Sequence, residues 1–136
     1  YDRKQTFFDK NLQTVTHIDF THPYSKMLRR QLIVAASTAG LNITTNGVYG
    51  CTQGPRLETA AEISRMERDG CDLVGMTGMP EAALARELEM EYATCAVVAN
   101  WAAGKTDRDI TMEEIERHLE KGMEDVRLLL EQFIRN

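Results

Sequence analysis

Apolar residues recur along the chain at two spacings, which separate helices from strands. Within 23–40 and 111–133 they stand three and four positions apart, as on one face of a helix. Short apolar runs bounded by turn residues are typical of strands. The predicted helices are 23–40, 59–69, 80–88 and 111–133, and the predicted strands are 47–52, 71–76 and 92–99. This alternation predicts an α/β fold.

Two of these helices carry terminal signals. The first is expected to open at Pro23, with Thr21 as its cap, and to end at Gly40. Thr111 and Glu114 fit a capping box for the last helix. Gly122 inside that helix costs about 1 kcal/mol relative to alanine. We expect its apolar stripe to pack in the core; the stripe consists of Ile115, Leu119, Val126, Leu129, Leu130 and Phe133.

Candidate chemistry follows the predicted strands. Residues 53–58, 76–78 and 100–101 come directly after the three apolar runs, whereas 1–20 and 100–110 as a whole are expected to be loops. In α/β sheets, ligands bind beyond the carboxyl ends of strands. If the strands are neighbours, the three ends converge on one crevice.

Composition restricts the partners. The formal charge of -5 and the pI of about 5.2 argue against a nucleic-acid surface. No apolar run reaches the roughly 18 residues of a membrane span, so we expect no membrane partner. Three scattered cysteines indicate a reduced, cytoplasmic protein. The length of 136 residues indicates one domain, and because the chain opens at Tyr1 rather than methionine, a trimmed protein or a piece of a longer one stays open.

Three motifs together resemble the trimeric nucleoside phosphorylase family, which includes purine nucleoside and methylthioadenosine phosphorylases. They are G-P-R-L-E-T at 54–59, G-C-D-L-V-G-M-T-G-M-P-E at 70–81 and A-V-V-A-N at 96–100. The resemblance is closest to the bacterial branch that cleaves S-methyl-5'-thioinosine. It implies a mixed central sheet flanked by helices, with residues 1–136 as the C-terminal part of a single domain whose N-terminal part is absent.

The resemblance also implies an activity. Phosphate attacks C1' of a purine nucleoside while the purine leaves, and S-methyl-5'-thioinosine gives hypoxanthine and 5-methylthioribose 1-phosphate. It implies a homotrimer, with inorganic phosphate as co-substrate and no metal or organic cofactor. Since the family's phosphate loop precedes the matched region, we do not expect this segment alone to be active.

Two residues match the sugar and phosphate side of the family's site. Thr77 matches a hydroxyl that donates to phosphate, and Met76 matches a methionine packed under the ribose. A thioether suits that place because it contacts a sugar face without requiring a hydrogen bond. From the residues alone, a turn hydroxyl at Thr77 and a core methionine at position 76 would be favoured over these roles.

The purine side falls on two other strand ends. The resemblance makes Asn100 the catalytic residue, because an amide can serve both O6 and N7 of a 6-oxopurine. Glu58 would accept the N1 proton, and Leu57 would lie beside the purine face, with Trp101 on the same side. Ala102 stands where methylthioadenosine phosphorylases have a second aspartate, which fits a 6-oxopurine enzyme. A turn asparagine and a solvated carboxylate are the plain alternatives.

The 5' end of the nucleoside involves three further residues. Met112 replaces a histidine that bonds the 5'-hydroxyl in ordinary nucleoside phosphorylases, and Ile115 extends an apolar wall suited to a methylthio group. Glu58, Asn100 and Met112 would set specificity. His17 matches a histidine that the family lends to the neighbouring subunit. Two alternatives remain: an inosine/guanosine phosphorylase, and a non-catalytic fragment of such an enzyme.

Overall fold

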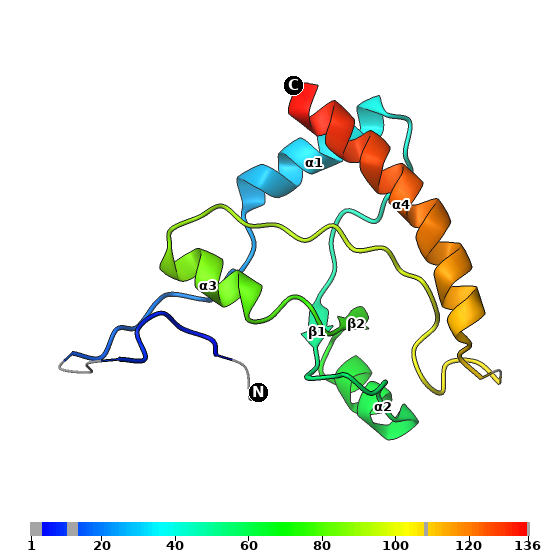
Figure 1. Cartoon of the computed structure of the whole chain (residues 1–136), viewed down its shortest axis with the longest axis horizontal. Coiled ribbons are helices and arrows are strands. Elements are labelled where there is room, and N and C mark those ends of the chain that lie inside the picture. The colour runs from blue at the N-terminus through cyan, green and yellow to red at the C-terminus, as the bar shows by residue number, and fades with distance from the viewer. Residues whose placement is uncertain (1–3, 11–13, 108, 136) are drawn as a thin grey trace.

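The computed structural model describes residues 4–10, 14–107 and 109–135. Figure 1 shows two helices side by side at one end of the molecule and a small sheet with a third helix toward the other. The elements are α1 (Lys26–Thr38), β1 (Tyr49–Cys51), α2 (Ala60–Arg68), β2 (Leu73–Gly75), α3 (Glu81–Glu87) and α4 (Met112–Arg135). The described residues within 1–20 form neither helix nor strand, as predicted, but the helix predicted to open at Pro23 begins at Lys26.

The sheet consists of β1 and β2, which run parallel with Tyr49 opposite Leu73 and Cys51 opposite Gly75. The backbone N–H of Thr52 donates to the Gly75 carbonyl at 2.9 Å and extends the ladder by one residue. Because the strands are parallel, both carboxyl ends lie at the same edge. The predicted α/β class is confirmed, and these two strand ends adjoin as the sequence predicted.

The predicted strand at 92–99 is wrong: this segment has no strand ladder. It crosses the molecule between α3 and α4 as an extended chain (Figure 1). Its backbone bonds go instead to a loop and a helix, since Ser25 N–H donates to Tyr92 O and His118 contacts Ala99 O. A strand needs a partner strand, and the part of the chain that the structure describes supplies none to 92–99. Val98 is accordingly 73% exposed.

Side-chain hydrogen bonds mark where α1 and α4 begin. The predicted cap Thr21 is wrong because α1 begins only at Lys26; the Thr21 N–H and hydroxyl donate to Asp19 Oδ1 instead. Ser25 caps α1 instead, and its Oγ accepts from Leu28 N–H at 3.1 Å. For α4, the Glu114 N–H donates to Thr111 Oγ1 at 3.4 Å, as half of the predicted capping box requires.

The core is small. The buried apolar residues among those described are Ala35, Ala36, Ile63, Ala82, Ala83 and Leu129. The chain exposes 10,471 Å², whereas a compact monomer of 15.4 kDa exposes about 7,200 Å². The α4 stripe reaches the core only in part, because Leu119 and Leu130 stay exposed.

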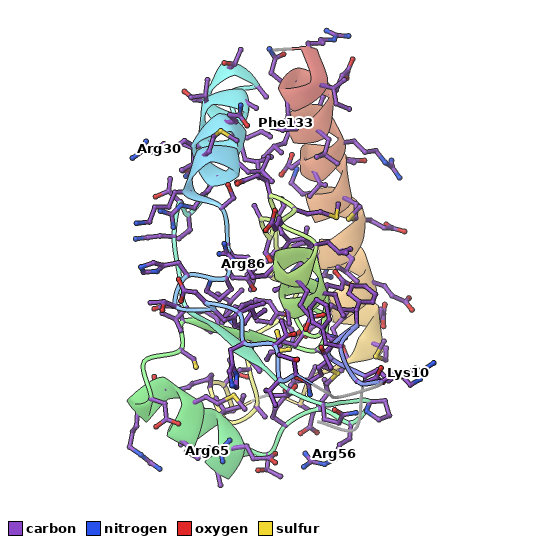
Figure 2. The ribbon with its side chains drawn as sticks, turned by 90° about the vertical axis from the view of Figure 1, so that its left-hand side faces the viewer. Lys10, Arg30, Arg56, Arg65, Arg86 and Phe133 are labelled. Atoms are coloured by element: carbon purple, nitrogen blue, oxygen red, sulfur yellow. The ribbon has the colours of Figure 1, made fainter. Side chains whose placement is uncertain are left out.

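Helices α1 and α4 pack against each other, and Figure 2 shows Phe133 beside both at the end of the molecule away from α2. A cavity of about 530 Å³ opens between these helices, the 41–47 loop and the 93–98 segment. Gly122 explains how α4 approaches that segment, since a methyl there would lie 2.3 Å from Val97 Cγ1. The glycine that weakens α4 therefore makes room for Val97.

Candidate functional site

The corner after β2 is built by contacts from β1. Tyr49 Oη lies 3.4 Å from Thr77 Oγ1 and accepts from Thr77 N–H at 3.4 Å. A methyl on Gly75 would lie 2.2 Å from that same Oη, so only glycine lets the ring pass. Thr77 is exposed and its neighbour Gly78 is buried. The Thr77 hydroxyl is thus presented to solvent on a backbone that the sheet holds.

Three aromatic rings surround this corner. Tyr24 stacks on Tyr92 with ring centroids 6.1 Å apart, and a methyl on Gly78 would meet both Tyr24 and Tyr49. Tyr92 donates to Glu81 Oε2 at 2.6 Å, and burial together with this carboxylate raises the pKa of Tyr92. The phenol therefore stays protonated and anchors the segment after α3 to the start of that helix.

Met76 and Glu58 lie at the adjacent strand ends. A methyl on Gly54 would come within 2.6 Å of Met76 Sδ, which places the loop after β1 directly against this methionine. Thr52 donates its hydroxyl proton to Glu58 Oε1 at 2.6 Å. Both partners in this bond are half-buried. The structure therefore brings Glu58, Met76 and Thr77 to one edge of the sheet, as the sequence predicted.

A second carboxylate fixes the outside of the same loop. Arg56 forms a two-pronged pair with Glu62, at 2.9 and 2.8 Å, and also donates to the Leu57 carbonyl. Glu62 completes a capping box with Thr59 at the start of α2. The Arg56 guanidinium, followed by the Thr59 backbone bond, lowers the pKa of Glu62 from 4.5 to about 2. Figure 2 shows Arg56 and Arg65 at the α2 end of the molecule.

Asn100 and its neighbours form a separate, exposed group. The Asn100 side-chain amide donates to the Trp101 carbonyl at 2.8 Å, and the Trp101 side chain is 73% exposed. Ala102 is half-buried, and its carbonyl accepts from Lys105 N–H. No hydrogen bond joins Asn100 to Glu58 among the described residues.

The loop after Asn100 nevertheless rests on α2. A methyl on Gly104 would lie 2.6 Å from Ala60 Cβ, and Lys105 pairs with Glu67. Ala60 is two residues from Glu58, so the loop that follows Asn100 contacts the start of α2 close in sequence to Glu58.

The start of α4 lies next to this group. His118 Nδ1 contacts the Ala99 carbonyl at 2.6 Å, which ties the helix to the residue before Asn100. Met112 is 65% exposed and Ile115 is half-buried. An exposed methionine and a half-buried isoleucine therefore stand one turn apart at the start of α4.

Two predicted residues stand apart from these groups. His17 is exposed in the segment before α1, and Leu57 is exposed beside Arg56. The cavity near α4 is lined by none of the predicted site residues. Sequence reasoning missed Tyr49, Thr52 and His118; for the first two, a hydroxyl side chain in or just after a strand that precedes a candidate loop is a signal that could have found them.

The described residues hold neither a metal-type cluster nor a membrane-crossing helix. No group of three or more His, Cys, Asp or Glu side chains could hold a metal ion within 4–10, 14–107 and 109–135. Over the same residues, no helix is both long and apolar enough to cross a membrane.

Similar proteins are about twice as long as this chain. A protein of Pseudomonas syringae pv. tomato named probable S-methyl-5'-thioinosine phosphorylase is 61% identical over 94% of this chain and 52% of its own length. A 6-oxopurine nucleoside phosphorylase of Pyrococcus furiosus is 47% identical over 91% of this chain and 49% of its own length. The chain thus spans about half of these relatives.

The fold is shared with a solved structure. A double mutant of the adenosine/methylthioadenosine phosphorylase of Schistosoma mansoni, in complex with adenine, superimposes with a TM-score of 0.92. It is 26% identical and is matched over 99% of this chain and 55% of its own. The family model described as Phosphorylase superfamily matches residues 1–135. The chain therefore belongs to the phosphorylase superfamily.

Proposed function

We propose that residues 1–136 are the C-terminal part of a single purine nucleoside phosphorylase domain. Its reaction converts S-methyl-5'-thioinosine and phosphate to hypoxanthine and 5-methylthioribose 1-phosphate. The observation that carries this proposal is the 61% identity with the Pseudomonas syringae protein of that name. The chain supplies most of the purine side and part of the sugar side of the site, in a cytoplasmic homotrimer.

Asn100 acts on the leaving purine in this proposal. Its amide donates to O6, and its carbonyl accepts from a protonated N7, so that charge developing on the base is stabilised. The Asn100 amide now bonds the Trp101 carbonyl and is exposed, so it exchanges one carbonyl acceptor for another when the purine binds. Trp101 and Ala102 lie on the same side of the base.

Glu58 selects the base. A 6-oxopurine carries a proton on N1, which a carboxylate accepts, whereas adenine has a lone pair there that a carboxylate repels. The half-buried position of Glu58 strengthens that distinction because fewer water molecules screen it. Leu57 lies beside the purine face.

The sugar and phosphate occupy the corner after β2. Met76 packs under the ribose, and the exposed Thr77 hydroxyl donates to phosphate, which is the nucleophile. Met112 and Ile115 take the 5'-methylthio group, and His17 reaches the 5' pocket of a neighbouring subunit. The reaction requires no metal or organic cofactor, so dialysis against EDTA leaves the rate unchanged.

A second candidate is a phosphorylase of inosine and guanosine. The 47% identity with the Pyrococcus furiosus 6-oxopurine nucleoside phosphorylase favours it. It shares Glu58 and Asn100 with the first candidate and differs at the 5' end. An apolar Met112 gives a 5'-hydroxyl no partner, which favours the methylthio substrate.

The test measures the release of the purine base by the full-length protein. Four nucleosides are compared with and without phosphate: inosine, adenosine and their 5'-methylthio analogues. The proposal predicts phosphate-dependent release, with the highest kcat/KM for S-methyl-5'-thioinosine. A higher value for inosine selects the second candidate, and a higher value for methylthioadenosine contradicts both. Hypoxanthine binding without turnover is the result expected of a non-catalytic fragment.

A further inference from the structure

Thr52 is fixed by the sheet, although it follows the last residue of β1. Its N–H donates to the Gly75 carbonyl at 2.9 Å, in line with the β1–β2 ladder. Glu58 lies six residues further on, in the loop before α2. A bond between the two therefore joins a loop carboxylate to the sheet.

The Thr52 hydroxyl has one proton and two acceptors within reach. Oγ1 lies 2.6 Å from Glu58 Oε1 and 3.4 Å from the Gly75 carbonyl. A distance of 2.6 Å is typical of a hydroxyl that donates to a carboxylate, so the proton points to Glu58. Oε2, the other oxygen, receives no hydrogen bond from the residues that the structure describes.

We propose that Thr52 is a positioning residue, which holds one oxygen of Glu58 against the sheet and leaves Oε2 to read N1 of the purine. This inference rests on the proposed function. A carboxylate fixed at one oxygen loses less rotational freedom when it binds N1–H. The same fixation prevents it from turning away from the lone pair of adenine, so Thr52 increases discrimination as well as affinity.

The test compares S-methyl-5'-thioinosine with methylthioadenosine, which differ at position 6 and in the N1 proton. Thr52→Val keeps the shape of the side chain and removes its donor. We expect the ratio of kcat/KM for the two substrates to fall roughly tenfold, about the effect of one hydrogen bond to a charged group. We expect Thr52→Val to act mainly by raising KM for S-methyl-5'-thioinosine, since the hydrogen bond from N1–H to Glu58 forms when the substrate binds.

Three variants isolate this effect. Thr52→Ser keeps the hydroxyl and is expected to retain the ratio. Thr45→Val makes the same chemical change in an exposed loop residue and is expected to leave the ratio unchanged. A purely structural role for Thr52 would lower the rates for both substrates alike. If Thr52→Val does not fold, as judged by its thermal unfolding, Thr52→Ala gives the same comparison.

The outcomes separate this inference from the proposed function. If Glu58→Gln abolishes the preference while Thr52→Val and Thr52→Ala keep the ratio within about twofold, Thr52 has no positioning role and the proposed function stands. If the unmodified protein prefers methylthioadenosine or releases no base, the proposed function fails first.

Discussion

The predicted purine site has two halves, which are built differently. One lies at the sheet edge after β1 and β2, and the other in the segment 92–101. Met76 and Thr77 directly follow β2, where the β1–β2 ladder and Tyr49 fix the corner. Glu58 lies in the loop after β1 and is tied to the sheet by Thr52. Asn100 follows a segment without a ladder and bonds its own neighbour, Trp101. A strand end orients a side chain only when another strand fixes its backbone.

The largest expected loss of stability comes from filling the space beside Gly75, at the edge after β1 and β2. Gly75→Ala would place a methyl 2.2 Å from Tyr49 Oη, so the ring must move away from Thr77. We expect the free energy of unfolding to fall by about 1–3 kcal/mol, the usual cost of overpacking. Urea denaturation measures it.

Gly47→Ala is the matched control for this change. Its methyl would come closest to Leu73 Cδ2, at 3.3 Å, which is the end of a side chain that can move, and would lie in ordinary contact with Asp72 at 3.6 Å. We expect a change within about 0.5 kcal/mol. Equal midpoints for the two variants would show that Tyr49 is not confined by Gly75.

The second region is tested at its contact with α4. Alanine at position 122 improves helix propensity by about 1 kcal/mol, but its methyl would lie 2.3 Å from Val97 Cγ1. We expect Gly122→Ala to destabilise the protein by about 1 kcal/mol net. In a Val97→Ala background the clash is gone and the same change should stabilise it. Stabilisation in both backgrounds would mean that 92–99 does not pack on α4.

A pH series probes how the β1 loop is held. The pKa of Glu62 is lowered from 4.5 to about 2 by Arg56 and Thr59. A lowered pKa contributes stability that is present above pH 4.5 and is lost as the pH falls toward 2. Between pH 6 and pH 3, Glu62→Gln should therefore lose less stability than the unmodified protein. Parallel losses would contradict this contribution.

The smallest effect is expected at the contact between the second region and α2. Lys105 and Glu67 form an exposed pair, and such pairs contribute about 0–1 kcal/mol. Lys105→Met should lower stability by no more than about 0.5 kcal/mol, and the difference should vanish in 1 M salt. A larger, salt-independent loss would show that the pair anchors the loop.

Local signals predicted the elements they govern. Gly40 and Gly70 follow α1 and α2 with positive φ angles, and the apolar runs before Thr52 and Met76 became β1 and β2. The segment 92–99 was predicted wrongly because a ladder depends on a partner elsewhere in space. The Thr21 cap failed because α1 begins five residues later, where Ser25 caps it.

The candidate site could be predicted only as a set of residue types. The motifs placed Glu58, Met76 and Thr77 at strand ends, and the parallel pairing brings those ends together. The sequence carried no sign that Thr52 would bond Glu58, since that bond depends on how the intervening loop folds back. The roles of Asn100 and Met112 on a substrate stay predictions.

The most direct test of the account is the substrate preference of Asn100→Asp. The measured quantity is the ratio of kcat/KM for S-methyl-5'-thioinosine to that for methylthioadenosine, with phosphate present. An aspartate accepts from the amino group of adenine and repels O6, so the ratio should fall by about tenfold or more. An unchanged ratio would contradict the claim that Asn100 binds the purine.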